Sequence, residues 1–342
     1  MRPHFSRKTT NAANLFKNPT FSNNIVNQTM KLSSPLKNSV VLTGSSGQLS
    51  QSIIKLWSSH PISMTHTLLP FSKSQLDITD PKSIDLKLPN RDVAVLINTA
   101  AYTDVNGAEI NHEISYEVNA LGPELLSKWA HNHNAKLLQV STDFVFDGNA
   151  SVPYDIYATP NPINIYGLSK RKGEECVIKK LPESSSIVRT SALYSSTGKN
   201  FVNTMLNLMI TRDSLSVIDD QIISPTSSNS LARVLMSIAQ KLVEGTAHKI
   251  YHWNDGGTLS WYDFATEIQK EALSLGLLKT RIPIARVPSR DYESMAQRPS
   301  YSVMDRGKTL TNFECPKESW QTQLNTVLKK KIEKNSHLTA GL

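Results

Sequence analysis

Cysteine and long hydrophobic runs are scarce in this sequence of 342 residues. Only two cysteines occur, Cys176 and Cys315, and neither belongs to a CxxC motif or to a cluster with histidine. This argues against a disulfide framework and a structural zinc site, and it favours a reducing, cytoplasmic setting. No uninterrupted apolar stretch approaches the roughly 18 residues that cross a bilayer, so we expect no membrane role.

Acidic residues are absent from the beginning of the chain, where the first one is Asp77. Eight basic residues precede it, so they account for the whole formal net charge of +8 and leave the remainder neutral. A nucleic-acid partner would require basic residues clustered on a folded surface, and we therefore expect none. Residues 1–37, rich in Asn, Ser and Thr, are predicted to form a disordered basic extension. A translation start at Met30 and a targeting role are both left open for this extension.

Strands and helices are predicted to alternate from residue 38 onward. The stretch 38–57 combines an apolar strand, a glycine turn and a helix with apolar residues at helical spacing. Further strands are predicted at residues 64–71, 92–102, 135–148 and 185–194, and helices at 113–134 and 168–180. This alternation is typical of an α/β protein with a Rossmann-type doubly wound parallel sheet, which binds ligands at the carboxyl ends of its strands.

The same pattern predicts a larger core and a smaller C-terminal lobe. Residues 38–190 are assigned to an NAD(P)-binding Rossmann core, to which elements around residues 214–255 are expected to return. The remainder is less regular and is interrupted by prolines. Residues 191–213 and 256–338 are therefore expected to form a substrate-binding lobe.

Gly44 and Gly47 in "TGSSGQLS" lie between the first strand and the first helix, as in a dinucleotide-binding site. Glycines there let the backbone approach a pyrophosphate, and the helix end offers free N–H groups. Ser50 stands where the usual pattern has a third glycine, which weakens the motif but keeps the side chain small. The segment after the second strand has no acid for a ribose 2′-hydroxyl. Ser72 and Lys73 suit a 2′-phosphate, so NADPH is the expected cofactor, with NADH left open.

Tyr166 and Lys170 in "NIYGLSKRKGEE" are four residues apart and thus share one face of a predicted helix. A phenol with an ordinary pKa of about 10 is a poor proton donor and acceptor at neutral pH unless a nearby cation stabilises the phenolate. Lys170 is expected to supply that charge. Thr142, at the end of a predicted strand, is expected to hydrogen-bond a substrate carbonyl and hold it for hydride attack.

With these motifs, the sequence resembles the dTDP-4-dehydrorhamnose reductase family of the extended short-chain dehydrogenase/reductases. The resemblance covers about residues 39–335 and runs through successive blocks, among them "LDITDP", "NTAAYTDVNGAE", "VNALGPELL", "STDFVFDG", "NIYGLSKRKGEE", "RTSALY" and "AQRPSYSVMD". It implies NAD(P)H-dependent reduction of the C4 keto group of dTDP-4-dehydro-L-rhamnose. The implied product is dTDP-L-rhamnose, for cell-surface polysaccharide synthesis.

The resemblance also implies a role for individual residues. By this likeness Tyr166 is the proton donor, Lys170 is its partner and a ribose ligand, and Thr142 is the third catalytic residue. Thr142 and Asp143 are the implied sugar contacts. The implied cofactor contacts are Gly44, Gly47, Gln48, Leu49, Asp77, Ile78, Ala101, Tyr102, Thr103, Tyr166 and Lys170.

Several positions depart from the family pattern or have no assigned role. Phe144 stands where the family usually has tyrosine and Ala192 where it has tryptophan, and both positions face the sugar in the family. Ser52 replaces a glutamate that is associated with a magnesium-linked dimer in some members, so no metal is expected, and a homodimer is left open. Arg298 is interpreted as either a diphosphate ligand or a brace for its own loop.

Two other functions stay open. A reductase of a related nucleotide-linked deoxysugar would fit, because Phe144 and Ala192 alter the sugar pocket. The sequence is also similar to the regulatory β subunit of methionine adenosyltransferase, a non-catalytic NADP-binding protein that keeps the tyrosine and the lysine. The stretches "GTLSWYDFA" and "AQRPSYSVMD" resemble the reductases more closely, and they favour an enzyme.

Overall fold

The computed structural model describes residues 38–247, 249–313 and 318–339; the predicted extension at residues 1–37 lies outside them. Six parallel strands form the central sheet in the order β10-β5-β4-β3-β1-β2. Their bounds are β1 (Asn38–Thr43), β2 (His66–Phe71), β3 (Val93–Asn98), β4 (Lys136–Thr142), β5 (Ser185–Thr190) and β10 (Ile250–Trp253). The strand order reverses between β1 and β3, the place where such sheets bind ligands. The predicted Rossmann-type fold is confirmed.

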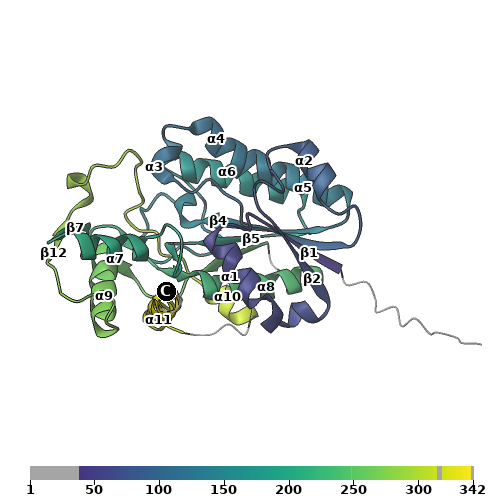
Figure 1. The fold of residues 1–342 in the computed structure, drawn as a ribbon. Coiled ribbons are helices and arrows are strands. Elements are labelled where there is room, and N and C mark those ends of the chain that lie inside the picture. The colour runs from purple at the N-terminus through teal and green to yellow at the C-terminus, as the bar shows by residue number, and fades with distance from the viewer. Residues whose placement is uncertain (1–37, 248, 314–317, 340–342) are drawn as a thin grey trace, which may run out of the picture. The chain divides into compact units, whose positions relative to one another are not determined.

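Helices cover both faces of this sheet (Figure 1). On one face lie α1 (Gln48–Leu56), α8 (Ser228–Val243) and α10 (Gly307–Asn312). On the other face lie α2 (Pro81–Lys87), α3 (Val105–Ala108), α4 (His112–Tyr116), α5 (Gly122–Asn132) and α6 (Ile165–Lys180). Short 3-10 helices span Trp57–Ser59, Pro61–Met64, Asp143–Val145 and Ser289–Asp291.

Strand β1 shows why two helix layers are needed. Val40 and Leu42 are buried in one apolar cluster with Ile53 of α1, whereas Val41 is buried in another with Leu126 of α5. Successive side chains of a strand point to opposite faces of the sheet. A strand that is apolar at every position can therefore be buried only between two layers of helices.

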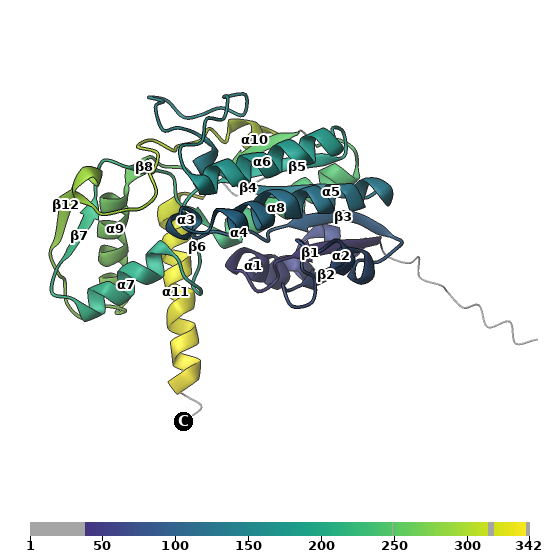
Figure 2. The ribbon, with the colours of Figure 1, turned by 90° about the horizontal axis from the view of Figure 1, so that it is seen from above.

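A third apolar cluster joins the elements of the C-terminal part. Leu206 of α7 (Phe201–Thr211), Phe264 of α9 (Trp261–Ser274) and Leu324 of α11 (Trp320–Thr339) are buried together. Figure 2 shows α7 and α9 beside a parallel pair of strands, away from the six-stranded sheet. That pair is β7 (Leu215–Ile218) and β12 (Ile284–Val287). Two further pairs of two-residue strands are β6 (Leu193–Tyr194) with β9 (Thr226–Ser227), and β8 (Ile222–Ile223) with β11 (Leu259–Ser260).

Two helices differ from their predicted bounds. The helix expected at residues 113–134 is interrupted by a π-helical turn at Glu117–Leu121. Pro123 follows this turn, and a proline cannot donate the backbone hydrogen bond that continues a regular helix. Helix α6 begins at Ile165 instead of residue 168, because the Asn164 side chain accepts a 2.8 Å hydrogen bond from the Gly167 N–H. This earlier start places Tyr166 in the first turn of the helix.

Membrane-spanning segments were predicted to be absent. Within the described residues, every helix is too short or too polar to cross a bilayer.

A pair of matched substitutions tests the placement of the core. Leu42→Ala removes a side chain that is 0% exposed, whereas Leu86→Ala removes one that is 80% exposed. Because truncation in a packed core loses both hydrophobic burial and contacts, Leu42→Ala is expected to lower the free energy of unfolding by about 2–5 kcal/mol. The surface control should change it by less than about 0.5 kcal/mol. Equilibrium denaturation measures both values, and equal losses would contradict the packing of β1.

Candidate active site

A cavity of about 590 Å³ opens where the carboxyl ends of the central strands meet. Gly44, Thr99, Thr142 and Thr190 line it from the ends of β1, β3, β4 and β5. The C-terminal part contributes other lining residues, namely Gln221, Ile223, Trp261, Arg298, Pro299 and Ser302. The cavity thus lies at the position that the parallel topology favours for ligands.

The glycine turn at the start of α1 forms one wall. Gly44 has a φ of +68°, and a Cβ there would lie 2.9 Å from backbone atoms of Ala100. Gly47 is the N-cap of α1, and its helix end has no side-chain cap and no acidic residue in the first turn. The backbone N–H groups of this end are suited to a phosphate. Ser50 stands in place of the third glycine, and its hydroxyl forms a 2.5 Å hydrogen bond with that of Thr99.

Gln48 connects the glycine turn to the segment that follows β6. Its side-chain oxygen accepts hydrogen bonds of 3.0 Å from the Ser195 hydroxyl and 3.1 Å from the Asn200 amide. Its amide nitrogen donates a weaker bond of 3.4 Å to the Leu193 carbonyl. Gln48, a predicted cofactor contact, therefore also holds the glycine turn against the segment around β6.

The cavity is also lined by Lys73, Asp77 and Ile78, which follow β2. Hydrogen bonding by the Thr79 backbone N–H is the main reason that the pKa of Asp77 lies below its usual value, and the charge of Lys73 acts in the same direction. Lys73 is exposed, so its ammonium group can reach a ligand that lies in the cavity.

Thr142, Tyr166 and Lys170 line the middle of the cavity. Thr142 is the last residue of β4, and its hydroxyl donates a 3.0 Å hydrogen bond to Asp143. Lys170 is buried, and its ammonium group donates a 2.7 Å hydrogen bond to the Val140 carbonyl of β4. Helix α6 supplies Tyr166 and Lys170 one turn apart, so they share a face as predicted.

Burial disfavours the charged form of both residues. It raises the pKa of Tyr166 to about 12, with a hydrogen bond to Thr142 acting in the opposite direction. It lowers the pKa of Lys170 to about 8, with the charge of Glu174 opposing the change. The prediction that Lys170 makes Tyr166 unusually acidic is therefore wrong for the protein without a ligand, because burial dominates the pKa of the phenol.

Asp143 is a buried carboxyl group beside the proposed reaction centre. Burial raises its pKa, while the hydroxyls of Ser302, Ser191 and Thr142 favour its charged form. Ser191 and Ser302 were not singled out from the sequence, although they belong to the blocks "RTSALY" and "SYSVMD". They come from segments far apart in the chain, so only the folded structure brings them to Asp143.

The structure brings all but two of the predicted site residues, Ser72 and Tyr102, to this cavity. The Ser72 hydroxyl donates a 2.8 Å hydrogen bond to the side-chain oxygen of Gln75. The amide of Asn119 binds both the backbone N–H (2.9 Å) and the carbonyl (3.0 Å) of Tyr102. The Tyr102 hydroxyl packs against Gly107 instead. Asn119, in the π-helical turn, thus holds the loop after β3 in place, a role without a clear signal in the sequence. The predicted residues that line the cavity are Gly44, Gly47, Gln48, Leu49, Asp77, Ile78, Ala101, Thr103, Thr142, Asp143, Tyr166 and Lys170.

Residues 38–332 match the model of the RmlD substrate binding domain family. The chain belongs to the RmlD family. A dTDP-4-dehydrorhamnose reductase from Aggregatibacter actinomycetemcomitans is 37% identical over 290 residues, which cover 84% of this chain and 97% of that protein. A homologue of the same name from Mycobacterium tuberculosis is 34% identical over 84% of this chain and 92% of its own length. The resemblance inferred from the sequence motifs is thereby confirmed.

Solved structures agree with membership of the RmlD family. The dTDP-4-dehydrorhamnose reductase of Bacillus anthracis, crystallised with NADP, has a TM-score of 0.75 and 33% identity, covering 86% of this chain and 100% of that one. A dTDP-glucose 4,6-dehydratase from Streptomyces venezuelae shares only 16% identity at a TM-score of 0.69, so it supports the fold alone.

The two departures that face the sugar in the RmlD family, Phe144 and Ala192, both border the cavity. The ring of Phe144 meets that of Tyr166 edge to face, with centroids 5.7 Å apart. Ala192 has a φ of +44°, an uncommon conformation for a residue other than glycine. Phe144 therefore packs against the proposed proton donor without offering a hydroxyl, and Ala192 leaves space where a tryptophan would stand.

Two glycine substitutions separate backbone strain from crowding at the glycine turn. Gly245→Ala, at a φ of +74° with no atom near the added methyl group, should lower the free energy of unfolding by roughly 1–2 kcal/mol. Gly44→Ala incurs a similar strain and also forces the methyl group against the Ala100 backbone. We expect thermal and chemical denaturation to show a clearly larger loss of stability for Gly44→Ala than for Gly245→Ala. Equal losses would contradict the close approach of the turn to Ala100.

Proposed function

We propose that this protein is an NADPH-dependent reductase that converts the C4 keto group of dTDP-4-dehydro-L-rhamnose to the alcohol of dTDP-L-rhamnose. The observation that carries the proposal is the cavity in which Thr142, Tyr166 and Lys170 lie at the strand ends, next to an uncapped helix end. The relatives that bear the name dTDP-4-dehydrorhamnose reductase support the same reaction. The product would serve cell-surface polysaccharide synthesis.

The cavity fits a dinucleotide along its length. The Gly44 turn and the first N–H groups of α1 suit the pyrophosphate, because no side chain blocks them. Lys73, beyond β2, suits a 2′-phosphate, and NADP is the cofactor in the related Bacillus anthracis structure. We assign Asp77 and Ile78 to the adenine side, and Ala101 and Thr103 to the path toward the nicotinamide.

The proposed chemistry adds a hydride to carbon and a proton to oxygen. Bound NADPH supplies the hydride. Thr142 turns its hydroxyl from Asp143 to donate a hydrogen bond to the keto oxygen, and Tyr166 delivers the proton to that oxygen as its negative charge develops. A Tyr166 hydroxyl with a pKa of about 12 holds its proton firmly until such a strong acceptor forms, and the Lys170 cation then stabilises the phenolate that remains.

Of the parts of this proposal, the identity of the sugar is the one that the site constrains least. A related protein from Streptomyces niveus, named dTDP-4-keto-6-deoxy-D-glucose reductase, is 30% identical over 83% of this chain. Phe144 and Ala192 change the wall next to the sugar, so a related nucleotide-linked deoxysugar is the second candidate. We also keep as proposals the division into core and substrate lobe, the cytoplasmic location and a homodimer.

The decisive experiment is direct. Purified protein is mixed with dTDP-4-dehydro-L-rhamnose and NADPH in neutral buffer, and the loss of NADPH absorbance is followed. The product is identified by mass and by chromatography. A rate that depends on both reactants supports the reductase. Absence of turnover with this sugar and with related keto sugars, together with co-purification of an adenosyltransferase, would favour the regulatory-subunit alternative.

Tyr166→Phe tests the proton donor. The substitution removes only the hydroxyl, so kcat should fall by at least about 100-fold while NADPH still binds. Tyr157→Phe is the matched control, because Tyr157 is 81% exposed and does not line the cavity. It should keep the wild-type rate. A Tyr166→Phe enzyme with an unchanged kcat would remove Tyr166 from the mechanism.

Lys73→Ala tests recognition of the 2′-phosphate. Loss of the ammonium group should weaken NADPH binding about 5- to 10-fold and leave NADH binding nearly unchanged, because only NADPH carries the extra phosphate. Fluorescence titration measures both dissociation constants. Lys82→Ala, at an exposed lysine outside the cavity, is the control. Equal weakening of the two cofactors would contradict the role given to Lys73.

A further inference from the structure

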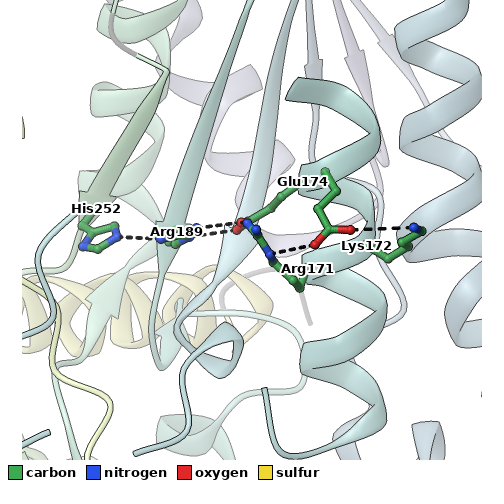
Figure 3. Close-up of polar contacts among 6 residues, drawn as sticks. Arg171, Lys172, Glu174, Arg189 and His252 are labelled. Carbon is green, nitrogen blue, oxygen red and sulfur yellow. Dashed lines mark hydrogen bonds and ion pairs between the residues drawn. The ribbon is translucent and has the colours of Figure 1, made fainter. Parts of the chain in front are cut away.

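A buried group of charges lies behind the proposed catalytic helix (Figure 3). Glu174 of α6, Arg189 of β5 and His252 of β10 are at most 1% exposed. Burial of charged groups costs free energy unless they are paired and hydrogen-bonded. The reaction proposed above uses none of the three, so the presence of this ion pair in the protein interior calls for another role.

Glu174 is held on two sides. Arg189 donates two hydrogen bonds to its carboxylate, of 2.9 Å from Nε and 2.7 Å from Nη2. Arg171, one turn earlier on α6, donates a third of 3.2 Å. These cations and the Ser141 hydroxyl hold the pKa of Glu174 below its usual value despite burial.

His252 completes the pairing of Arg189 without adding charge. Burial, reinforced by the charge of Arg189, lowers the pKa of His252 to about 3, so its ring is neutral. Its Nδ1 lies 3.2 Å from the Tyr154 carbonyl and its Nε2 lies 3.4 Å from Arg189 Nη1, as expected when Nδ1 donates and Nε2 accepts. The Arg189 guanidinium also lies over the Phe146 ring, 5.2 Å from its centroid. Arg189 is thus fixed in one orientation.

Helix α6 meets strand β4 through three side chains spaced four residues apart. Lys170 donates a 2.7 Å hydrogen bond to the Val140 carbonyl. Tyr166 and Glu174 lie near the Thr142 and Ser141 hydroxyls, which lower the pKa of the phenol and of the carboxyl group, respectively. Arg189 is the residue of β5 that pairs with Ser141. The Glu174–Arg189 ion pair therefore ties the third turn of the helix to β5, next to the segment of β4 that the first two turns face.

We propose that Glu174, held by Arg189, is a positioning residue that fixes the height and rotation of α6 against β4 and keeps the Lys170 ammonium on the Val140 carbonyl. This inference rests on the proposed reductase function. A buried ion pair is weak evidence for stability, because well-packed apolar residues often replace such a pair without loss. Placement of a second, functional cation explains why a carboxylate stands here.

The proposal predicts a change in pH dependence as well as in rate. Glu174 is the titratable group whose charge acts on Lys170, and Tyr166 and Asp143 line the same cavity. The groups that face Glu174 are Arg171, Arg189 and His252. The Glu174 charge favours the protonated form of Lys170, so its removal should lower the pKa of Lys170 further below about 8. The loss of activity as pH rises should then begin at a lower pH.

Glu174→Gln is the main test, because it keeps the shape of the side chain and removes its charge. We expect kcat to fall about 10-fold at neutral pH and the basic limb of the rate profile to move down by about half a pH unit or more. Binding of NADPH, titrated by fluorescence across the same pH range, should weaken at a correspondingly lower pH. Glu175→Gln removes a neighbouring carboxylate that is half-exposed and pairs with Arg171 and Lys172, and it should leave both profiles unchanged.

A double variant separates positioning from folding. Glu174→Gln combined with Arg189→Met also removes the guanidinium that would be left without its partner, so the melting temperature should recover toward the wild-type value. The pH profiles should stay shifted. Recovery of both the rate and the pH profiles, or a Glu174→Gln profile that overlays that of the wild type, would overturn the proposal. A wild-type protein that binds NADPH but reduces no keto sugar would instead refute the proposed function.

Discussion

The close approach of α6 to the segment after β4 and to the π-helical turn is the constraint on which the site depends. A Cβ at Gly167 would lie 2.1 Å from the Phe144 carbonyl oxygen, and a Cβ at Gly173 would lie 2.1 Å from that of Asn119. Real Cβ atoms do not approach oxygen so closely, so the helix can occupy this position only with glycines there. The same proximity lets Tyr166 and Lys170 reach the last residues of β4.

Close packing also buries polar groups and thereby shifts their pKa values. Tyr166 and Lys170 are both shifted toward their neutral forms, and Asp143 is shifted in the same sense, because each lies in a largely desolvated region. A charged ligand group or reaction intermediate beside any of these groups would therefore shift its protonation. Perturbed groups gathered in one cavity are typical of a site that transfers protons.

The cavity also depends on contacts between segments that are distant in sequence. Gln48 at the start of α1 binds Ser195 and Asn200, and Ser191 and Ser302, from two other segments, line the cavity together with Asp143. These contacts therefore connect the glycine turn and the strand ends to the C-terminal part. A ligand that touches all of them would reinforce these contacts, since binding to the native state stabilises it.

Local patterns were sufficient to predict the parallel sheet, the glycine turn and the shared face of Tyr166 and Lys170. Strand and helix periodicity, turn glycines and spacing along a helix are properties of neighbouring residues, and the carboxyl ends of parallel strands necessarily meet at one edge. Only the folded chain decided that Tyr102 faces away from the cavity, that Tyr166 is made less acidic, and that Arg189 pairs with Glu174. Those outcomes depend on burial and on partners brought together by tertiary packing, and neither quantity is encoded in any short stretch of the chain.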